Sequence, residues 1–193
     1  MSKFYLEVPT LQRKEDALEY LNEHIIQNAK INGTGGLNRC SKGMSYEEWL
    51  DDVTKMPDSN YSEALGLVPT YTYFLIRKED NRIVGMVNLR YNLNEMMAKY
   101  AGHIGYGIRP SERQKGYAKI QLYLILQKAL ELGLTNVMIS CDASNTASDC
   151  TIKALDGKFE RNDFMHDVLI NIYWINVKEV LEKYKNVYEM YID

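Results

Sequence analysis

A cluster of cationic and small residues in the stretch "IRPSERQKGYAK", residues 108–119, has the composition of an anion-binding turn. Arg113 and Lys115 carry full positive charges, and Gly116 would let the backbone approach a ligand closely. A helix that begins at this point adds unpaired backbone N–H groups and about half a positive charge. The cluster therefore indicates a site for a phosphate or diphosphate, with a charged surface turn as the alternative.

This turn lies between a predicted strand and a predicted helix, which together would fix its position. The strand is "YAGHIGYGI", residues 100–108, and Pro110 stops it. In the helix, apolar residues recur at spacings of three and four from Ala118 to Leu132, and Gly133 ends it. "NVMISCD" follows as a buried strand. A strand, a helix and a strand within about 30 residues are typical of a right-handed parallel crossover.

Other elements are predicted on both sides of this unit. Downstream, residues 145–155 and the C-terminal "VKEVLEKY" are expected to be helical and residues 167–175 to form a strand. Upstream, we expect a strand at residues 3–8 and a first helix whose apolar face carries Ala17, Leu18, Leu21, Ile25 and Ala29. The capping box of Ser45 and Glu48 predicts the start of a second helix, and residues 71–77 and 82–91 are expected to form a hairpin.

One loop stands out in this pattern. Residues 31–40 contain three glycines, and we expect either a lid or acceptor-site loop there or a plain connector.

The whole chain has the composition of one folded domain, and we expect residues 1–193 to form it. Apolar residues make up 46% and charged residues 25%, which excludes a mostly disordered protein. The net charge of -3 argues against nucleic-acid or anionic-membrane partners. No apolar run is long enough to span a membrane, so we expect a cytoplasmic protein. No metal site is expected from the spacing of its cysteines and histidines: Cys40, Cys141, Cys150, His24, His103 and His166.

The stretch "IRPSERQKGYA" resembles the acetyl-CoA motif of the GNAT superfamily of N-acetyltransferases, Q/R-x-x-G-x-G/A. Arg113, Gly116 and Ala118 occupy its three defining positions. The order of "VPTYTYFLIR", "IVGMVNLRY", "GHIGYGIRPSERQKGYA" and "CDASNTAS" is similar to a bacterial branch of predicted acetyltransferases. The resemblance covers nearly the whole chain and is strongest from about Val68 to Gly157.

This resemblance implies an α/β fold with a mixed, mostly antiparallel central sheet, flanked by helices, whose fourth and fifth strands splay apart around pantetheine. Acetyl-CoA would be the cosubstrate, without a metal. Loop amides would bind the diphosphate, and Ile108 would offer main-chain groups to pantetheine. Asn145 matches a CoA-contacting asparagine of the family and could equally cap a helix. The implied contacts are made by Ile108, Arg113, Gln114, Lys115, Gly116, Tyr117, Ala118, Lys119, Asn145 and Ser148.

The implied reaction is direct transfer of an acetyl group to the primary amine of a small molecule or peptide. His103 is the candidate general base, because it lies on the fourth strand, titrates near neutral pH and aligns with the family's glutamate base, although a histidine on a buried strand is often a packing residue. Glu95 is the fallback. Ile152 stands where many relatives have a tyrosine acid, and Asp156 replaces the first glycine of a common Gly-Gly pair.

Two other functions stay open at this point. Without the tyrosine acid, the protein could be a non-catalytic sensor that binds acyl-CoA. A nucleotide-phosphate module is the last alternative, because the turn matches neither GxxxxGK[ST] nor GxGxxG. The sequence does not identify the acceptor amine, and it leaves the oligomeric state open, with a homodimer possible.

Overall fold

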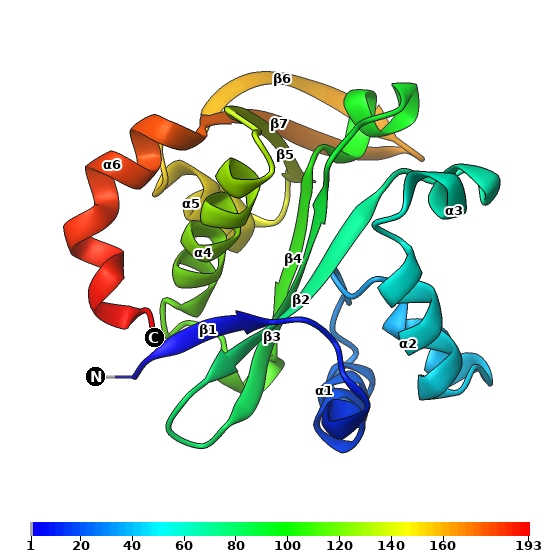
Figure 1. Ribbon diagram of the computed structural model, residues 1–193. Coiled ribbons are helices and arrows are strands. Elements are labelled where there is room, and N and C mark those ends of the chain that lie inside the picture. Colours follow the sequence, from blue (N-terminus) through cyan, green and yellow to red (C-terminus); the bar gives the residue numbers. More distant parts are fainter. Residues whose placement is uncertain (1) are drawn as a thin grey trace.

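Two antiparallel sheets form the centre of the computed structural model, which describes residues 2–193 (Figure 1). The first sheet has the order β1-β2-β3-β4 and the second the order β5-β7-β6. The strands are β1 (Phe4–Glu7), β2 (Thr70–Arg77), β3 (Arg82–Arg90), β4 (Ile104–Ile108), β5 (Asn136–Asp142), β6 (Lys158–Met165) and β7 (Val168–Asn176).

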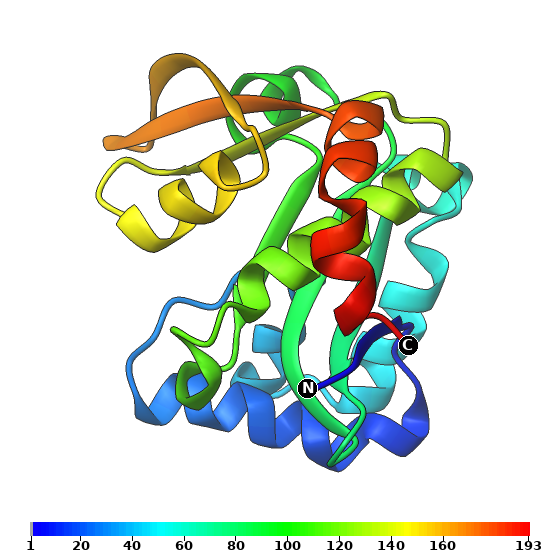
Figure 2. The same ribbon diagram turned by 90° about the vertical axis from the view of Figure 1, so that its left-hand side faces the viewer.

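Helices cover both faces of the first sheet. The helices of the structure are α1 (Lys14–Ile26), α2 (Tyr46–Lys55), α3 (Ser59–Ala64), α4 (Tyr117–Glu131), α5 (Thr146–Lys153), which packs on β5 of the second sheet, and α6 (Val177–Tyr188). Side chains that alternate along β2 serve the two faces. Phe74 and Ile76 pack with α1 and α2, whereas Leu75 packs with α4 and α6. Figures 1 and 2 show α1 and α2 on one side of the sheet and α4 and α6 on the other.

The strands β4 and β5 lie next to each other at one end and part at the other. A single isolated bridge joins Gly102 to Ile139, and the backbone N–H of His103 donates to Met138 O at 2.8 Å. Beyond this corner, β5 pairs with β7 and β4 with β3. The expected splay of the fourth and fifth strands is confirmed. The expected succession of strand, helix and strand is present as β4, α4 and β5, and it connects the two sheets, since β5 has no regular ladder with β4.

The first helix was predicted in the right place, and its predicted buried face is correct for Ala17 and Leu21 but not for Ile25. Ile25 is 48% exposed, while Tyr20 and His24 are buried. The reason is Arg109, whose fully buried guanidinium lies beneath the helix. It bonds to Asp16 at 2.7 Å and to Glu19 at 2.9 Å, and it lies 5.6 Å from the centre of the Tyr20 ring. The face of α1 that meets the sheet is therefore partly polar.

Other elements agree with the sequence or add to it. The capping box of Ser45 and Glu48 is present at the start of α2. The loop of residues 31–40 runs into a 3-10 helix (Leu37–Lys42), and a π-helical turn (Met97–Ala101) precedes β4; neither was expected. None of the helices in residues 2–193 combines the length and apolarity that crossing a membrane requires.

We predict that Gly102→Ala weakens the corner between the sheets. Gly102 has φ 69°, and a Cβ there would lie 2.3 Å from Met138 O. Backbone strain and the clash together should lower the free energy of unfolding by roughly 2–4 kcal/mol. Gly133→Ala is the control, because Gly133 has φ 82° but open space around it, and should cost only about 1 kcal/mol. Urea unfolding measures both, and equal losses would contradict the prediction.

Candidate active site

The turn before α4 holds five consecutive backbone donors without a partner. Gln114 and Gly116 have left-handed backbones, with φ 63° and 83°, and no side chain caps the helix. Within residues 2–193, no hydrogen bond reaches the amide N–H groups of residues 114–118. Exposed amides at a helix N-terminus favour an anion. The left-handed backbone at Gly116 is the conformation that glycine adopts most readily.

The two cations of this turn have different surroundings. Arg113 is exposed, donates from Nε to Ile108 O at 3.2 Å and has no carboxylate within 4.0 Å among the described residues. Lys115 bonds to Glu112 at 2.8 Å, and Glu112 also accepts from Arg77 at 2.7 Å. Burial alone would raise the pKa of Glu112, but the hydrogen bonds from Arg77 and Lys115 lower it on balance. Glu112 thus stays ionised and holds Lys115, which leaves Arg113 free to meet an anion.

A cavity of about 770 Å³ adjoins this turn and extends between β4 and α5. Nine of the ten predicted contact residues line it, and Lys115 is the exception. One wall comes from the residues that follow α1, including Lys30 and Asn32. The structure therefore brings together residues that are distant in the sequence around one elongated space.

The start of α5 forms the far wall of this cavity. Asn145 caps the helix, because its Oδ1 accepts from the Ser148 N–H at 3.1 Å. Capping is thus observed, while the role of Asn145 in binding a ligand stays a prediction. The hydroxyl oxygens of Ser148 and Tyr106 lie 2.8 Å apart. Burial raises the pKa of Tyr106 to about 12, so the phenol keeps its proton at neutral pH.

Tyr106 was missed by the sequence analysis. It lies in β4 between Gly105 and Gly107, and its side chain points to the opposite face of the strand from those two positions. Gly107 would place a Cβ 2.9 Å from Asn32 O, so the glycines admit the loop on one face while the tyrosine reaches α5 on the other. The "GYG" pattern in a predicted strand was the available signal.

A second cavity of about 460 Å³ abuts the first. The two share Lys30, Asn32, Tyr106, Asn145 and Ser148, so Tyr106 lies where they meet. The second cavity is also lined by Arg90, Cys141, Asp142 and His166. Burial raises the pKa of the Cys141 thiol to about 11, so this sulfur is a protonated wall group at neutral pH.

His103, the predicted base, lies at the corner between the sheets. Its Nδ1 accepts from the Met138 N–H at 2.9 Å, and it lines neither cavity. Burial and the nearby Arg90 lower its pKa, so the ring is neutral. Its catalytic role stays a prediction. Glu95 is exposed and also lines neither cavity, and Ile152 is fully buried.

The glycine loop before α2 is held against the first sheet. Gly33 has φ 69°, and a Cβ there would lie 2.4 Å from Gly105 O. The Gly35 N–H donates to Asn88 Oδ1 at 3.1 Å, and Trp49 Nε1 donates to Gly35 O at 3.0 Å. The loop forms a tethered wall, to which Asn32 contributes in both cavities.

Asp156, where a glycine was expected, takes a left-handed backbone with φ 56°. Its carboxylate accepts from Lys183 at 2.6 Å and from Tyr184 at 2.9 Å, so the turn is built with aspartate and tied to α6. In residues 2–193, no group of three or more His, Cys, Asp or Glu side chains is arranged to hold a metal ion.

Comparisons with known proteins agree with this geometry. The model of the "Acetyltransferase (GNAT) domain" matches residues 8–158. The microcin C7 self-immunity acetyltransferase MccE, solved with acetyl-CoA and AMP, is 18% identical, with a TM-score of 0.57 over 89% of this chain and 91% of that one. RimL, the ribosomal L7/L12 alpha-N-protein acetyltransferase, solved with coenzyme A, is 16% identical, with a TM-score of 0.61 over 91% and 96%.

A GNAT-family acetyltransferase from Bacillus anthracis is 15% identical, with a TM-score of 0.60 over 92% of this chain and 99% of that one. At these identities the structures show a common fold. No curated protein sequence gives a significant match.

We predict that His103 makes the protein less stable in mild acid. Its ordinary pKa is 6.5, and burial lowers it in the folded state. The unfolded chain therefore binds a proton first as the pH falls, so the stabilisation is complete above the ordinary pKa and is lost below it. Denaturant unfolding from pH 7.5 to 5 should show a smaller loss for His103→Asn than for the wild type. Exposed His166→Asn is the control, and an undiminished loss in His103→Asn would contradict the prediction.

Proposed function

Because this chain belongs to the GNAT acetyltransferase family, we propose that it transfers the acetyl group of acetyl-CoA to a primary amine of a small molecule or peptide. Transfer would occur directly, with both substrates bound. The observation that carries this proposal is the row of five free amides beside Arg113, which lies at one cavity. A second cavity adjoins the first at Tyr106.

The first cavity suits coenzyme A. The free amides of residues 114–118 and the unpaired Arg113 match a diphosphate in charge and hydrogen-bonding capacity. The parted edge of β4 leaves main-chain groups near Ile108 for the amide-bearing pantetheine arm. MccE and RimL, which share the fold, were solved with acetyl-CoA and with coenzyme A. Bound in this way, acetyl-CoA supplies the activated thioester.

The second cavity would receive the amine. An amine must lose its proton before it attacks, and this costs about 4.6 kcal/mol at pH 7 for a lysine-like amine with a pKa of about 10.4. An α-amine with a pKa of about 7.7 to 8.0 needs only about 1 kcal/mol. An α-amine is therefore the less demanding acceptor. Asp142 of this cavity is paired with Lys30, and His166 also lines the cavity. His103 lines neither cavity and its Nδ1 already accepts from the Met138 N–H, so its role as base stays a prediction.

Tyr106 is our candidate to assist the departing thiolate. Its hydroxyl lies at the junction of the two cavities, 2.8 Å from Ser148 Oγ, and its raised pKa keeps the proton available. In many relatives a tyrosine of the helix corresponding to α5 is the acid, and this chain has Ile152 at that position. Tyr106 would supply the proton from β4 instead. A hydrogen bond is enough, since a thiolate with a pKa of about 8.5 leaves readily.

The alternative is a non-catalytic sensor of acyl-CoA. The burial of Ile152, in the place of an expected acid, favours it. Both functions require coenzyme A binding, but only the transferase releases free thiol from acetyl-CoA in an amine-dependent manner. A screen of amines with a thiol readout separates the two, and binding without release for every amine would favour the sensor.

We predict that a negative charge in the turn weakens coenzyme A binding. Gly116→Asp and Gly116→Asn place side chains of nearly equal size at the same left-handed position, which both tolerate better than other residues do. Only the aspartate repels a diphosphate. By calorimetry, the Kd of Gly116→Asp should exceed that of Gly116→Asn by about tenfold or more, which corresponds to about 1.4 kcal/mol. Equal affinities, or no heat with the wild type, would remove the basis of the proposal.

We predict that Tyr106→Phe slows transfer without weakening coenzyme A binding. The kcat should fall by roughly 10- to 100-fold, at the lower end for a positioned proton donor, while KM for acetyl-CoA changes by less than about threefold. Since the pKa of Tyr106 is about 12, the wild type should lose no activity through this group between pH 7 and 10. Tyr123→Phe is the control, because its hydroxyl bonds to Leu181 O. Unchanged kcat in Tyr106→Phe would refute this role.

A further inference from the structure

Arg90 is a cation without an anionic partner in the wall of the second cavity. Of the eight arginines in the chain, six have a carboxylate within 4.0 Å among residues 2–193: Arg13, Arg39, Arg77, Arg82, Arg109 and Arg161. The two others are Arg113, in the proposed diphosphate turn, and Arg90. Each of these two lines one of the two adjoining cavities. The parallel suggests that Arg90, like Arg113, meets the charge of a ligand.

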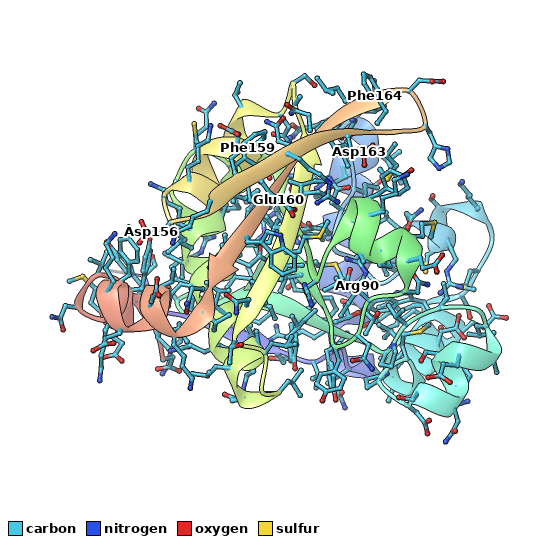
Figure 3. All side chains as sticks on the ribbon, turned by 90° about the horizontal axis from the view of Figure 1, so that it is seen from above. Arg90, Asp156, Phe159, Glu160, Asp163 and Phe164 are labelled. Carbon is cyan, nitrogen blue, oxygen red and sulfur yellow. The ribbon has the colours of Figure 1, made fainter. Side chains whose placement is uncertain are left out.

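The position of Arg90 makes its guanidinium available to the cavity. Arg90 ends β3 beside the segment that carries Met97–Ala101, as Figure 3 shows. Its Nη1 donates to Gly102 O at 3.0 Å, and Nη2 lies 3.9 Å from where a Cβ on Gly105 would be. The glycine thus leaves room beside the guanidinium. Arg90 lines the second cavity, and within residues 2–193 neither Nε nor Nη2 has a hydrogen-bond partner.

The remaining charges of this cavity do not neutralise Arg90. Asp142, its one carboxylate among the described residues, is paired with Lys30. Burial lowers the pKa of the Arg90 guanidinium, since the cation has lost water without gaining an anion nearby. A partly buried cation is stabilised when a carboxylate or phosphate binds it, and the planar guanidinium accepts such groups in a two-point contact.

We propose that Arg90 binds a carboxylate or phosphate group of the acceptor, so that the preferred substrate is a small amine that also carries an anionic group. The proposal rests on the acetyl transfer proposed above. Val87 pairs with Tyr106, so Arg90, three residues further along β3, has its side chain on the opposite face of the strand, beside Gly105. Both Arg90 and Tyr106 nevertheless line the second cavity.

The test compares matched amines with and without an anionic group. The carboxylate arm uses L-amino acids against their amides, and the phosphate arm uses O-phosphoethanolamine against ethanolamine, with thiol release as the readout. The wild type should prefer the anionic member of at least one arm by tenfold or more in kcat/KM. Arg90→Gln should lower kcat/KM for that member about 100-fold and change that of the neutral member by less than about threefold.

Two further variants keep the result interpretable. Arg161→Gln removes the same charge from an arginine that pairs with Glu160 and lines neither cavity, and it should retain the preference. Arg90→Lys keeps the charge but loses the two-point contact, so it should lower kcat/KM for the anionic amine by about tenfold; it also serves if Arg90→Gln fails to fold. No preference in the wild type, or equal losses for both members of a pair in Arg90→Gln, would overturn the proposal.

A failure of acetyl transfer is recognised separately. If no amine is acetylated although coenzyme A binds, the same probes are titrated into the CoA-saturated protein by calorimetry. Heat from an anionic probe that disappears in Arg90→Gln supports the anion site even without transfer. Absence of heat in the wild type, or equal heat in the two proteins, overturns it.

Discussion

The single corner that joins the two sheets is the constraint on which the rest of the molecule depends. Gly102 bridges to Ile139, and His103 exchanges two hydrogen bonds with Met138, one through its backbone and one through its ring. From there β4 and β5 diverge, because each pairs with a different neighbour. Both cavities lie along this divergence, and Tyr106 stands between them. A neutral His103 ring stabilises this corner, because its Nδ1 accepts from the Met138 N–H.

Buried charges fix the parts that surround the cavities. Arg109 is fully buried and holds α1 through Asp16 and Glu19, and the residues that follow this helix form a cavity wall. Glu112 joins Arg77 to Lys115 and so anchors the turn before α4 to the first sheet. Such buried pairs are costly to leave incomplete, so each partner is needed once the other is buried. They serve to orient the turn and the helix more than to add net stability.

Local signals led to a correct prediction wherever a short stretch of the chain decides the outcome. The capping box of Ser45 and Glu48, and the glycine at position 116, act within a few residues, and both were found where expected. Partners that are distant in sequence could not be predicted from spacing. Glu112 lies only three residues before Lys115, but its pairing with Arg77, 35 residues earlier, could not be predicted. The exposure of Ile25 in α1 was missed for the same reason, because Arg109 lies 93 residues from Asp16.

The divergence of β4 from β5 also has a mechanical meaning. Since the bridge at Gly102 joins β4 to β5 at one end only, a small change of angle there becomes a larger displacement at the far ends of the strands. The six steps from Gly102 to Ile108 span about 20 Å at about 3.3 Å each, so a tilt of about 5° at the corner displaces the Ile108 end by roughly 1.7 Å. Because β4 is held in one sheet and β5 in the other, the width of the gap depends on the angle between the two sheets, which can change without breaking the ladder hydrogen bonds of either sheet.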